Sequence, residues 1–151
     1  MLLDIHSHIL PAVDDGAFDI SESLMLLEAM RLQGITDVIA TPHFYPLDDN
    51  FNKYKERISN AYNLLIKETE NKNLPRIFVG SEVLYYRYIG TSETVYELCL
   101  NRSQYLLLEL TDECICKEFF DDIDNLVNKQ RIIPIICLLY TSPSPRDRTR
   151  S

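Results

Sequence analysis

The chain has 151 residues, of which 46% are hydrophobic and 25% charged, and its formal net charge is −8. These proportions are typical of a soluble globular protein with one domain and its own core, and the acidity argues against a broad nucleic-acid-binding surface. The apolar run 132–139 is far too short to cross a bilayer, and the N-terminus lacks the regions of a signal peptide, so we expect a cytoplasmic protein without membrane insertion.

Apolar, β-branched runs alternate with amphipathic segments along the chain. In chain order, strands are predicted at residues 2–5, 35–40, 77–80, 105–108 and 132–136, and helices at 19–33, 51–71, 94–100 and 117–129. Strands that are apolar along their whole length and alternate with helices indicate a parallel sheet covered by helices. The pattern therefore predicts an α/β fold, either an open sheet or a (β/α) barrel.

The first predicted strand carries two histidines two positions apart. Residues two apart in a strand point to the same side, so Asp4, His6 and His8 share one face. Two imidazoles placed in this way can bind one divalent metal ion through ring nitrogens. The Asp-Asp-Gly turn at 14–16 can bring a carboxylate back toward the same ion, because glycine permits a tight turn. Two surface histidines beside a polar turn are the simpler alternative.

The next three predicted strands also end in residues that bind metals. His43 follows the second strand, Glu82 the third and Glu109 the fourth. Each residue alone would more often be an ordinary loop or solvated side chain. In parallel α/β folds, however, the carboxyl ends of the strands meet on one face, where active sites lie. Glu109 follows three leucines, so we expect it to be partly buried, which is costly for a carboxylate without a cation or a donor.

This set of ligands indicates a hydrolase that uses metals rather than a protein nucleophile. Three histidines, two glutamates and one or two aspartates suit two or three divalent ions such as Mn²⁺, Fe²⁺ or Zn²⁺. In multi-metal hydrolases one ion activates a water and the others hold phosphate oxygens. The chain has neither a Cys-x5-Arg phosphate loop nor a Gly-x-Ser-x-Gly elbow, and its four cysteines form no Cys-x-x-Cys pair.

Four short segments carry these candidate ligands. They are Asp-Ile-His-Ser-His-Ile-Leu-Pro-Ala-Val-Asp-Asp-Gly (4–16), Ile-Ala-Thr-Pro-His (39–43), Gly-Ser-Glu-Val (80–83) and Leu-Leu-Leu-Glu-Leu (106–110). In this order they resemble the PHP (polymerase and histidinol phosphatase) superfamily and, within it, the bacterial capsular or exopolysaccharide tyrosine phosphatases. The resemblance runs from the first residue to about residue 136.

The resemblance implies a fold, a metal cluster and a substrate. The family fold is a distorted (β/α)7 barrel of the TIM-like type, of which residues 1–137 would form a partial barrel with parallel strands. The implied metal ligands are His6, His8, Asp15, His43, Glu82 and Glu109, with Asp4 and Asp14 supporting them. Glu82 resembles the carboxylate that bridges the ions, and Mn²⁺ is the implied metal. The implied activity is the hydrolysis of phosphotyrosine on a protein, notably a bacterial tyrosine autokinase that controls polysaccharide export.

The end of the chain departs from the family. There the strand matching 132–136 leads into a further histidine ligand and a phosphate-binding arginine, but here Cys137 stands at that place. Residues 138–151 have no apolar period and resemble a translated sequencing adapter, so we expect a disordered, non-native tail after an interrupted reading frame. A basic anchor or a proline-rich ligand is the alternative for this tail. With ligands absent, we expect this chain to be impaired as a phosphatase.

Three other functions remain open at this stage. The same fold could serve a small-molecule phosphatase of the histidinol phosphatase kind, or a PHP nuclease, against which the net charge of −8 argues. The chain could also be a non-catalytic, metal-binding partner of a kinase.

Overall fold

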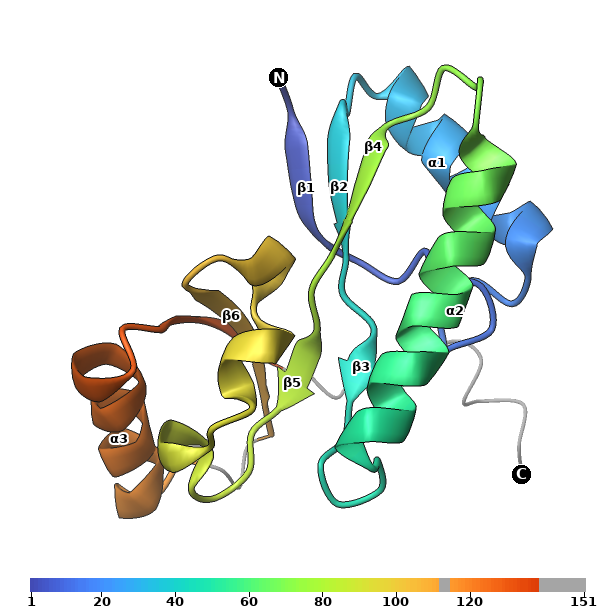
Figure 1. Cartoon of the computed structure of the whole chain (residues 1–151). Helices are drawn as coiled ribbons and strands as arrows, with labels where there is room; N and C mark the ends of the chain where they lie inside the picture. Colours follow the sequence, from blue (N-terminus) through green and yellow to red (C-terminus); the bar gives the residue numbers. More distant parts are fainter. Residues whose placement is uncertain (112–114, 139–151) are drawn as a thin grey trace, which may run out of the picture.

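The computed structural model describes residues 1–111 and 115–138 of the chain (Figure 1). Within these residues the strands are β1 (Leu3–Ser7), β2 (Asp37–Ala40), β3 (His43–Phe44), β4 (Arg76–Val79), β5 (Glu82–Leu84), β6 (Tyr105–Leu110) and β7 (Ile133–Leu138). They form a three-stranded sheet in the order β1-β2-β4 and a four-stranded sheet in the order β3-β5-β6-β7, and neighbours are parallel throughout. The predicted tail lies outside the described residues, apart from the backbone of Leu138.

Two of the predicted strands run from one sheet into the other. The chain leaves β2 at Thr41-Pro42 and resumes as β3, and it leaves β4 at Gly80-Ser81 and resumes as β5. Pro42 has no N–H to donate, so a regular ladder ends there. A Cβ at Gly80 would lie 2.9 Å from the Cα of Leu100, a backbone atom, so glycine is required for this close approach.

These breaks do not change which strands are neighbours. Ala40 of β2 is paired with Val79 of β4, and His43 of β3 with Glu82 of β5, so each broken strand keeps its partner. The five predicted strands therefore lie side by side in chain order. The parallel α/β arrangement is confirmed, and no closed barrel is seen in the described part of the chain.

Helices α1 (Ile20–Leu32) and α2 (Phe51–Thr69) lie together on one side of β1, β2 and β4 (Figure 1). Both begin as the sequence indicates, because Asp19 accepts the N–H of Glu22 and Asn50 accepts that of Lys53. The core that they cover is apolar, with fully buried side chains from each layer: Leu27 of α1, Leu65 of α2 and Val38 of β2. No helix in residues 1–111 and 115–138 is long and apolar enough to span a bilayer.

The second half of the chain is less regular than predicted. The helix expected at 94–100 is two 3₁₀ turns, Val95–Leu98 and Leu100–Arg102, because Cys99 between them is extended. Helix α3 (Lys117–Asp124) continues as a π-helical turn, Asn125–Lys129. Buried Asp122 of α3 accepts hydrogen bonds from the hydroxyl of Tyr85 and from the N–H groups of Tyr88 and Gly90. The carboxylate thus holds the segment that follows β5 against α3.

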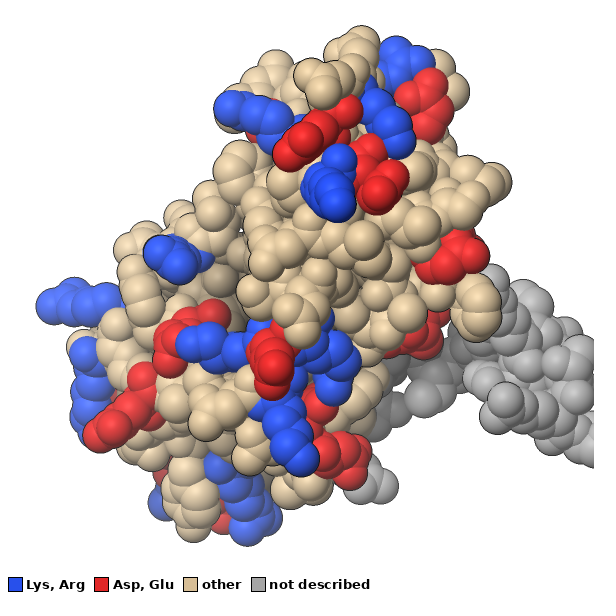
Figure 2. All heavy atoms as spheres, turned by 45° about the vertical axis from the view of Figure 1, so that its right-hand side comes forward, with Lys and Arg blue, Asp and Glu red and all other residues tan. Residues whose placement is uncertain are grey.

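The surface carries charges of both signs. On the face shown in Figure 2, Lys and Arg side chains are interspersed with Asp and Glu side chains. Among the described residues, exposed ion pairs include Arg31 with Glu28 and Lys55 with Glu97. Pairs of this kind contribute little to stability, so the apolar core and not the surface charge stabilises the fold.

Candidate metal centre

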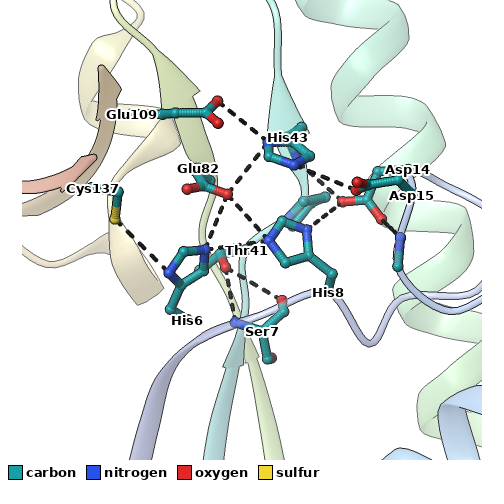
Figure 3. A network of polar contacts seen from close by, with 12 residues as sticks. His6, Ser7, His8, Asp14, Asp15, Thr41, His43, Glu82, Glu109 and Cys137 are labelled. Carbon is teal, nitrogen blue, oxygen red and sulfur yellow. Dashed lines mark hydrogen bonds and ion pairs between the residues drawn. The ribbon is translucent and has the colours of Figure 1, made fainter. Parts of the chain in front are cut away.

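The end of β1 directs two imidazoles toward one point. Asp4 pairs with Val38 and Ser7 with Ala40, so one extra residue of β1 is accommodated between them as a bulge. His6 and His8 follow each other on the same side, and their Nε2 atoms are 3.3 Å apart. The His6 and His8 imidazoles thus lie together (Figure 3), whereas the face predicted to include Asp4 is interrupted by the bulge. Asp4 accepts the backbone N–H of His6 at 3.1 Å, so its side chain contacts the backbone of the strand.

A single carboxylate oxygen lies at the centre of the three imidazoles. Oε2 of Glu82 is 3.0 Å from Nε2 of His6, 3.1 Å from Nε2 of His8 and 3.3 Å from Nδ1 of His43. Glu82 begins β5 and is 4% exposed, while His43 begins the neighbouring β3 in direct register with it. The break in the two strands therefore brings a histidine and a glutamate from different segments next to the end of β1.

The loop after β1 brings Asp14 back under His8. Because a carboxylate can only accept, Nδ1–H of His8 donates to Oδ2 of Asp14 at 2.8 Å, which leaves Nε2 facing Glu82. The same carboxylate accepts the N–H groups of His43 and Gly16, at 3.1 and 3.0 Å. At Gly16 a Cβ would lie 2.2 Å from the carbonyl oxygen of His8, so the loop closes this tightly only with glycine.

Asp15 and Glu109 lie on opposite sides of His43. Asp15 is exposed, and its Oδ1 is 3.4 Å from Nε2 of His43. Glu109 of β6 is 2% exposed, which confirms its expected burial, and its Oε2 is 3.6 Å from Nδ1 of His43. Among the described residues, neither His43 Nδ1 nor Glu109 Oε2 has a hydrogen-bond partner, although both atoms are buried. Two buried polar atoms that face each other without hydrogen bonds are expected at a cation-binding site when the cation is absent.

The electrostatics of the cluster reflect its crowded carboxylates. Burial alone would lower the pKa of His8, but hydrogen bonds with Asp14 and Glu82 outweigh it and raise the pKa to about 10. Burial alone would raise the pKa of Glu82, but the bonds with His6 and His8 lower it to about 2. Burial and the neighbouring charge of Glu82 raise the pKa of Glu109. The site thus favours positive charge, which protons supply in the metal-free protein and a divalent cation can supply instead.

Two neighbours of the cluster were not among the predicted site residues. The ring of Tyr45 is stacked on that of His43, with centroids 5.1 Å apart and planes at 17°. The thiol sulfur of Cys137, in β7, is 3.9 Å from Nδ1 of His6. Burial and the charges of Glu82 and Glu109 raise the pKa of Cys137 to about 11. Cys137 could have been found from the sequence because it directly follows the last predicted strand, whereas no sequence feature pointed to Tyr45.

The fold and the site together define a class of protein. It is a parallel α/β protein in which successive strand ends gather imidazoles and carboxylates into one cluster whose donor set suits divalent cations. The chain belongs to the capsular polysaccharide synthesis family CpsB/CapC, whose sequence profile matches residues 2–138. The resemblance seen in the sequence motifs is thereby confirmed.

Individual relatives are named as tyrosine phosphatases. The chain is 34% identical over 113 residues to tyrosine-protein phosphatase YwqE of Bacillus subtilis, a match that covers 72% of this chain and 42% of that protein. It is 29% identical over 133 residues to tyrosine-protein phosphatase CpsB of Streptococcus agalactiae serotype V, with 83% and 52% covered. The chain thus spans about half the length of the curated relatives it matches.

A solved structure has the same fold. It is one of the crystal structures of YwqE from Bacillus subtilis and CpsB from Streptococcus pneumoniae, which are described as unique metal-dependent tyrosine phosphatases. The TM-score is 0.70 at 29% sequence identity, and the match covers 89% of this chain and 54% of that one.

Proposed function

We propose that this chain carries the metal-binding half of a metal-dependent protein-tyrosine phosphatase active in capsular or exopolysaccharide synthesis. The observation that carries the proposal is the convergence of three imidazoles on Glu82 Oε2, within 3.0 to 3.3 Å, beside the orphaned atoms of His43 and Glu109. The names of the relatives supply the substrate class, and the chain order of its strands supports a partial barrel of the PHP type.

Six side chains would hold the ions: His6, His8, Asp15, His43, Glu82 and Glu109. Imidazole and carboxylate donors in this mixture fit Mn²⁺, with Fe²⁺ or Zn²⁺ as alternatives, in a cluster of two or three ions. Bound ions would supply an acidified water and offset the charge of a phosphate. Within the chain, Asp14 keeps the proton of His8 on Nδ1 and so holds Nε2 available as a donor.

A cavity beside the cluster gives a substrate access to it. It has a volume of about 360 Å³ and is lined by His43, Tyr45, Arg57 and four aspartates, Asp14, Asp15, Asp48 and Asp49, so a phosphate would enter it only with bound cations to offset this negative charge. A phosphorylated side chain entering there would reach the strand ends with its phosphate and place its ring near Tyr45. A phosphotyrosine protein, such as a bacterial tyrosine autokinase, is therefore the partner that we propose.

The proposal is tested by metal analysis and by a comparison of substrates. The purified chain, and the same protein with Glu82→Gln, are loaded with Mn²⁺ and analysed for bound metal, and each is then given a phosphotyrosine peptide, a phosphoserine peptide and histidinol phosphate. Because the chain is expected to be impaired, we expect it to retain Mn²⁺ and to show weak turnover that prefers the phosphotyrosine peptide, and the Glu82 variant to lose both. Preference for histidinol phosphate would favour a small-molecule phosphatase. Bound metal without turnover of any substrate would favour a non-catalytic partner of a kinase.

A further inference from the structure

The residue between His6 and His8 is the last residue of β1, and it is held by the threonine that directly follows β2. Ser7 donates its backbone N–H to Oγ1 of Thr41 at 3.0 Å. The carbonyl of Ser7 accepts the N–H of Thr41 at 2.7 Å and the hydroxyl of Thr41 at 3.3 Å (Figure 3). Thr41 is fully buried and Ser7 is 6% exposed, so water does not compete for these bonds.

These bonds fix the residue at which regular pairing resumes after the bulge, since Ser7 is paired with Ala40 and the extra residue lies between Asp4 and Ser7. A buried N–H without a partner costs about 1–3 kcal/mol. Thr41 removes that cost by accepting the N–H of Ser7. Its β-branched side chain has few rotamers, and it precedes Pro42, which restricts its backbone to extended conformations. The oxygen that holds Ser7 is therefore itself fixed.

The direction of both imidazoles follows from this contact. His6 and His8 flank Ser7, so the orientation of the two peptide units at Ser7 sets where their Cβ atoms point. Their Nε2 atoms are 3.3 Å apart and both face Glu82. Thr41 also lies two residues before His43, so one side chain joins the segments that carry all three imidazoles.

We propose that Thr41 is a positioning residue, which sets the separation of the His6 and His8 imidazoles for a shared cation by holding the backbone of Ser7. The inference rests on the proposed metal centre, but it concerns a residue outside the set of ligands. The hydrogen bonds of Thr41 in the described part of the chain are with the backbone of Ser7, through which it would act on the imidazoles.

The chain contains a matched control for this residue. At the other end of the same pair of strands, Thr36 makes similar contacts with Leu2. Oγ1 of Thr36 accepts the N–H of Leu2 at 3.3 Å and lies 3.2 Å from its carbonyl oxygen, which accepts the N–H of Thr36 at 2.9 Å. Thr36 is exposed, and its hydroxyl donates to Oδ2 of Asp37 at 2.6 Å, so Thr36→Val removes this bond as well. Replacing either threonine by valine removes the same hydroxyl from the same type of contact, but only Thr41 lies beside the histidines.

The experiment compares Thr41→Val, Thr41→Ala and Thr41→Ser with Thr36→Val in the full chain. Mn²⁺ affinity is measured by electron paramagnetic resonance, the geometry of the site by the visible absorption of bound Co²⁺, and folding by circular dichroism. We expect Thr41→Val to weaken Mn²⁺ binding about tenfold or more and to alter the Co²⁺ spectrum. Thr41→Ser, which keeps the hydroxyl, and Thr36→Val should stay close to the unsubstituted protein. Thr41→Ala removes the hydroxyl without adding a methyl group, and it decides the matter if the valine variant does not fold.

Two results would overturn the inference: Mn²⁺ affinity and Co²⁺ absorption that are unchanged in a folded Thr41 variant without a hydroxyl, or an equal loss of affinity in Thr36→Val. Failure of the unsubstituted chain to bind Mn²⁺ would instead contradict the proposed metal centre. In that case the imidazole signals of His6 and His8 in nuclear magnetic resonance spectra of the metal-free protein decide the role of Thr41. Signals shifted in Thr41→Val but not in Thr36→Val support it, and unshifted signals refute it.

Discussion

Replacing Asp14 by asparagine should weaken the fold and the metal centre together. The side chain of Asp14 is 6% exposed and accepts three hydrogen bonds, from Nδ1–H of His8 and from the N–H groups of His43 and Gly16. Asparagine has one acceptor oxygen. If that oxygen serves His8 and His43, the amide NH₂ faces the N–H of Gly16, and two donors meet. The reverse orientation places the NH₂ against His8 instead.

The size of the effect follows from these contacts. A buried donor left without an acceptor costs about 1–3 kcal/mol, and the bond to His8 loses its charge assistance, which adds about 1 kcal/mol. The metal-free Asp14→Asn protein should therefore lose about 2–4 kcal/mol of unfolding free energy. Mn²⁺ affinity should fall roughly 10- to 100-fold, because His8 loses the partner that fixes its tautomer.

Asp15→Asn is the matched control, since its side chain is 83% exposed. It should change the stability of the metal-free protein by less than about 0.5 kcal/mol, while still weakening Mn²⁺ binding if Asp15 is a ligand. Urea unfolding of the EDTA-treated proteins and Mn²⁺ titration measure the two quantities separately. Equal stability of the Asp14 variant and the unsubstituted protein, or a larger loss for the Asp15 variant, would refute the reasoning.

Three further changes test other parts of the structure. Gly16→Ala should lower both the unfolding midpoint and Mn²⁺ affinity, because its Cβ would lie 2.2 Å from the carbonyl oxygen of His8; a midpoint equal to that of the unsubstituted protein would contradict the close approach. Asp122→Ala removes three hydrogen bonds that hold the segment after β5 and should cost about 3 kcal/mol or more in urea unfolding, with Mn²⁺ affinity unchanged. The pKa of His8 is raised from 6.5 to about 10, so its stabilisation of the metal-free fold is complete below 6.5 and is lost as the pH rises through about 10. Thermal unfolding at a series of pH values should show this fall, and a midpoint that stayed level through about pH 10 would argue against the contact of His8 with Asp14 and Glu82.

Apolar periodicity predicted most of the fold and the residues that gather at the site. It indicated the five strand positions, and the ends of four strands supplied the three histidines and two glutamates that the structure brings together. The short strands β3 and β5 were missed because two or three residues carry no periodicity, and only pairing with a neighbour defines them. The prediction of a helix at 94–100 was wrong because the backbone of Cys99 is extended, and the residue type does not indicate this conformation.

Residue spacing alone could not separate the roles of Asp14 and Asp15, and only the family resemblance implied Asp15 as the ligand. The two residues are adjacent and chemically identical, and either could turn toward the histidines. The tight contact of Gly16 with His8 closes the loop so that Asp14 points inward and Asp15 remains exposed. Tyr45 was missed for a similar reason, since its ring meets His43 only through the short strand that follows Pro42.

The division of the strands between two sheets has a mechanical consequence. His6 belongs to the three-stranded sheet, whereas His43, Glu82 and Glu109 belong to the four-stranded one. An ion bound by all four side chains would link the two sheets to each other. Loading the protein with Mn²⁺ should then slow amide hydrogen exchange in both sheets at once, including strands that contribute no ligand.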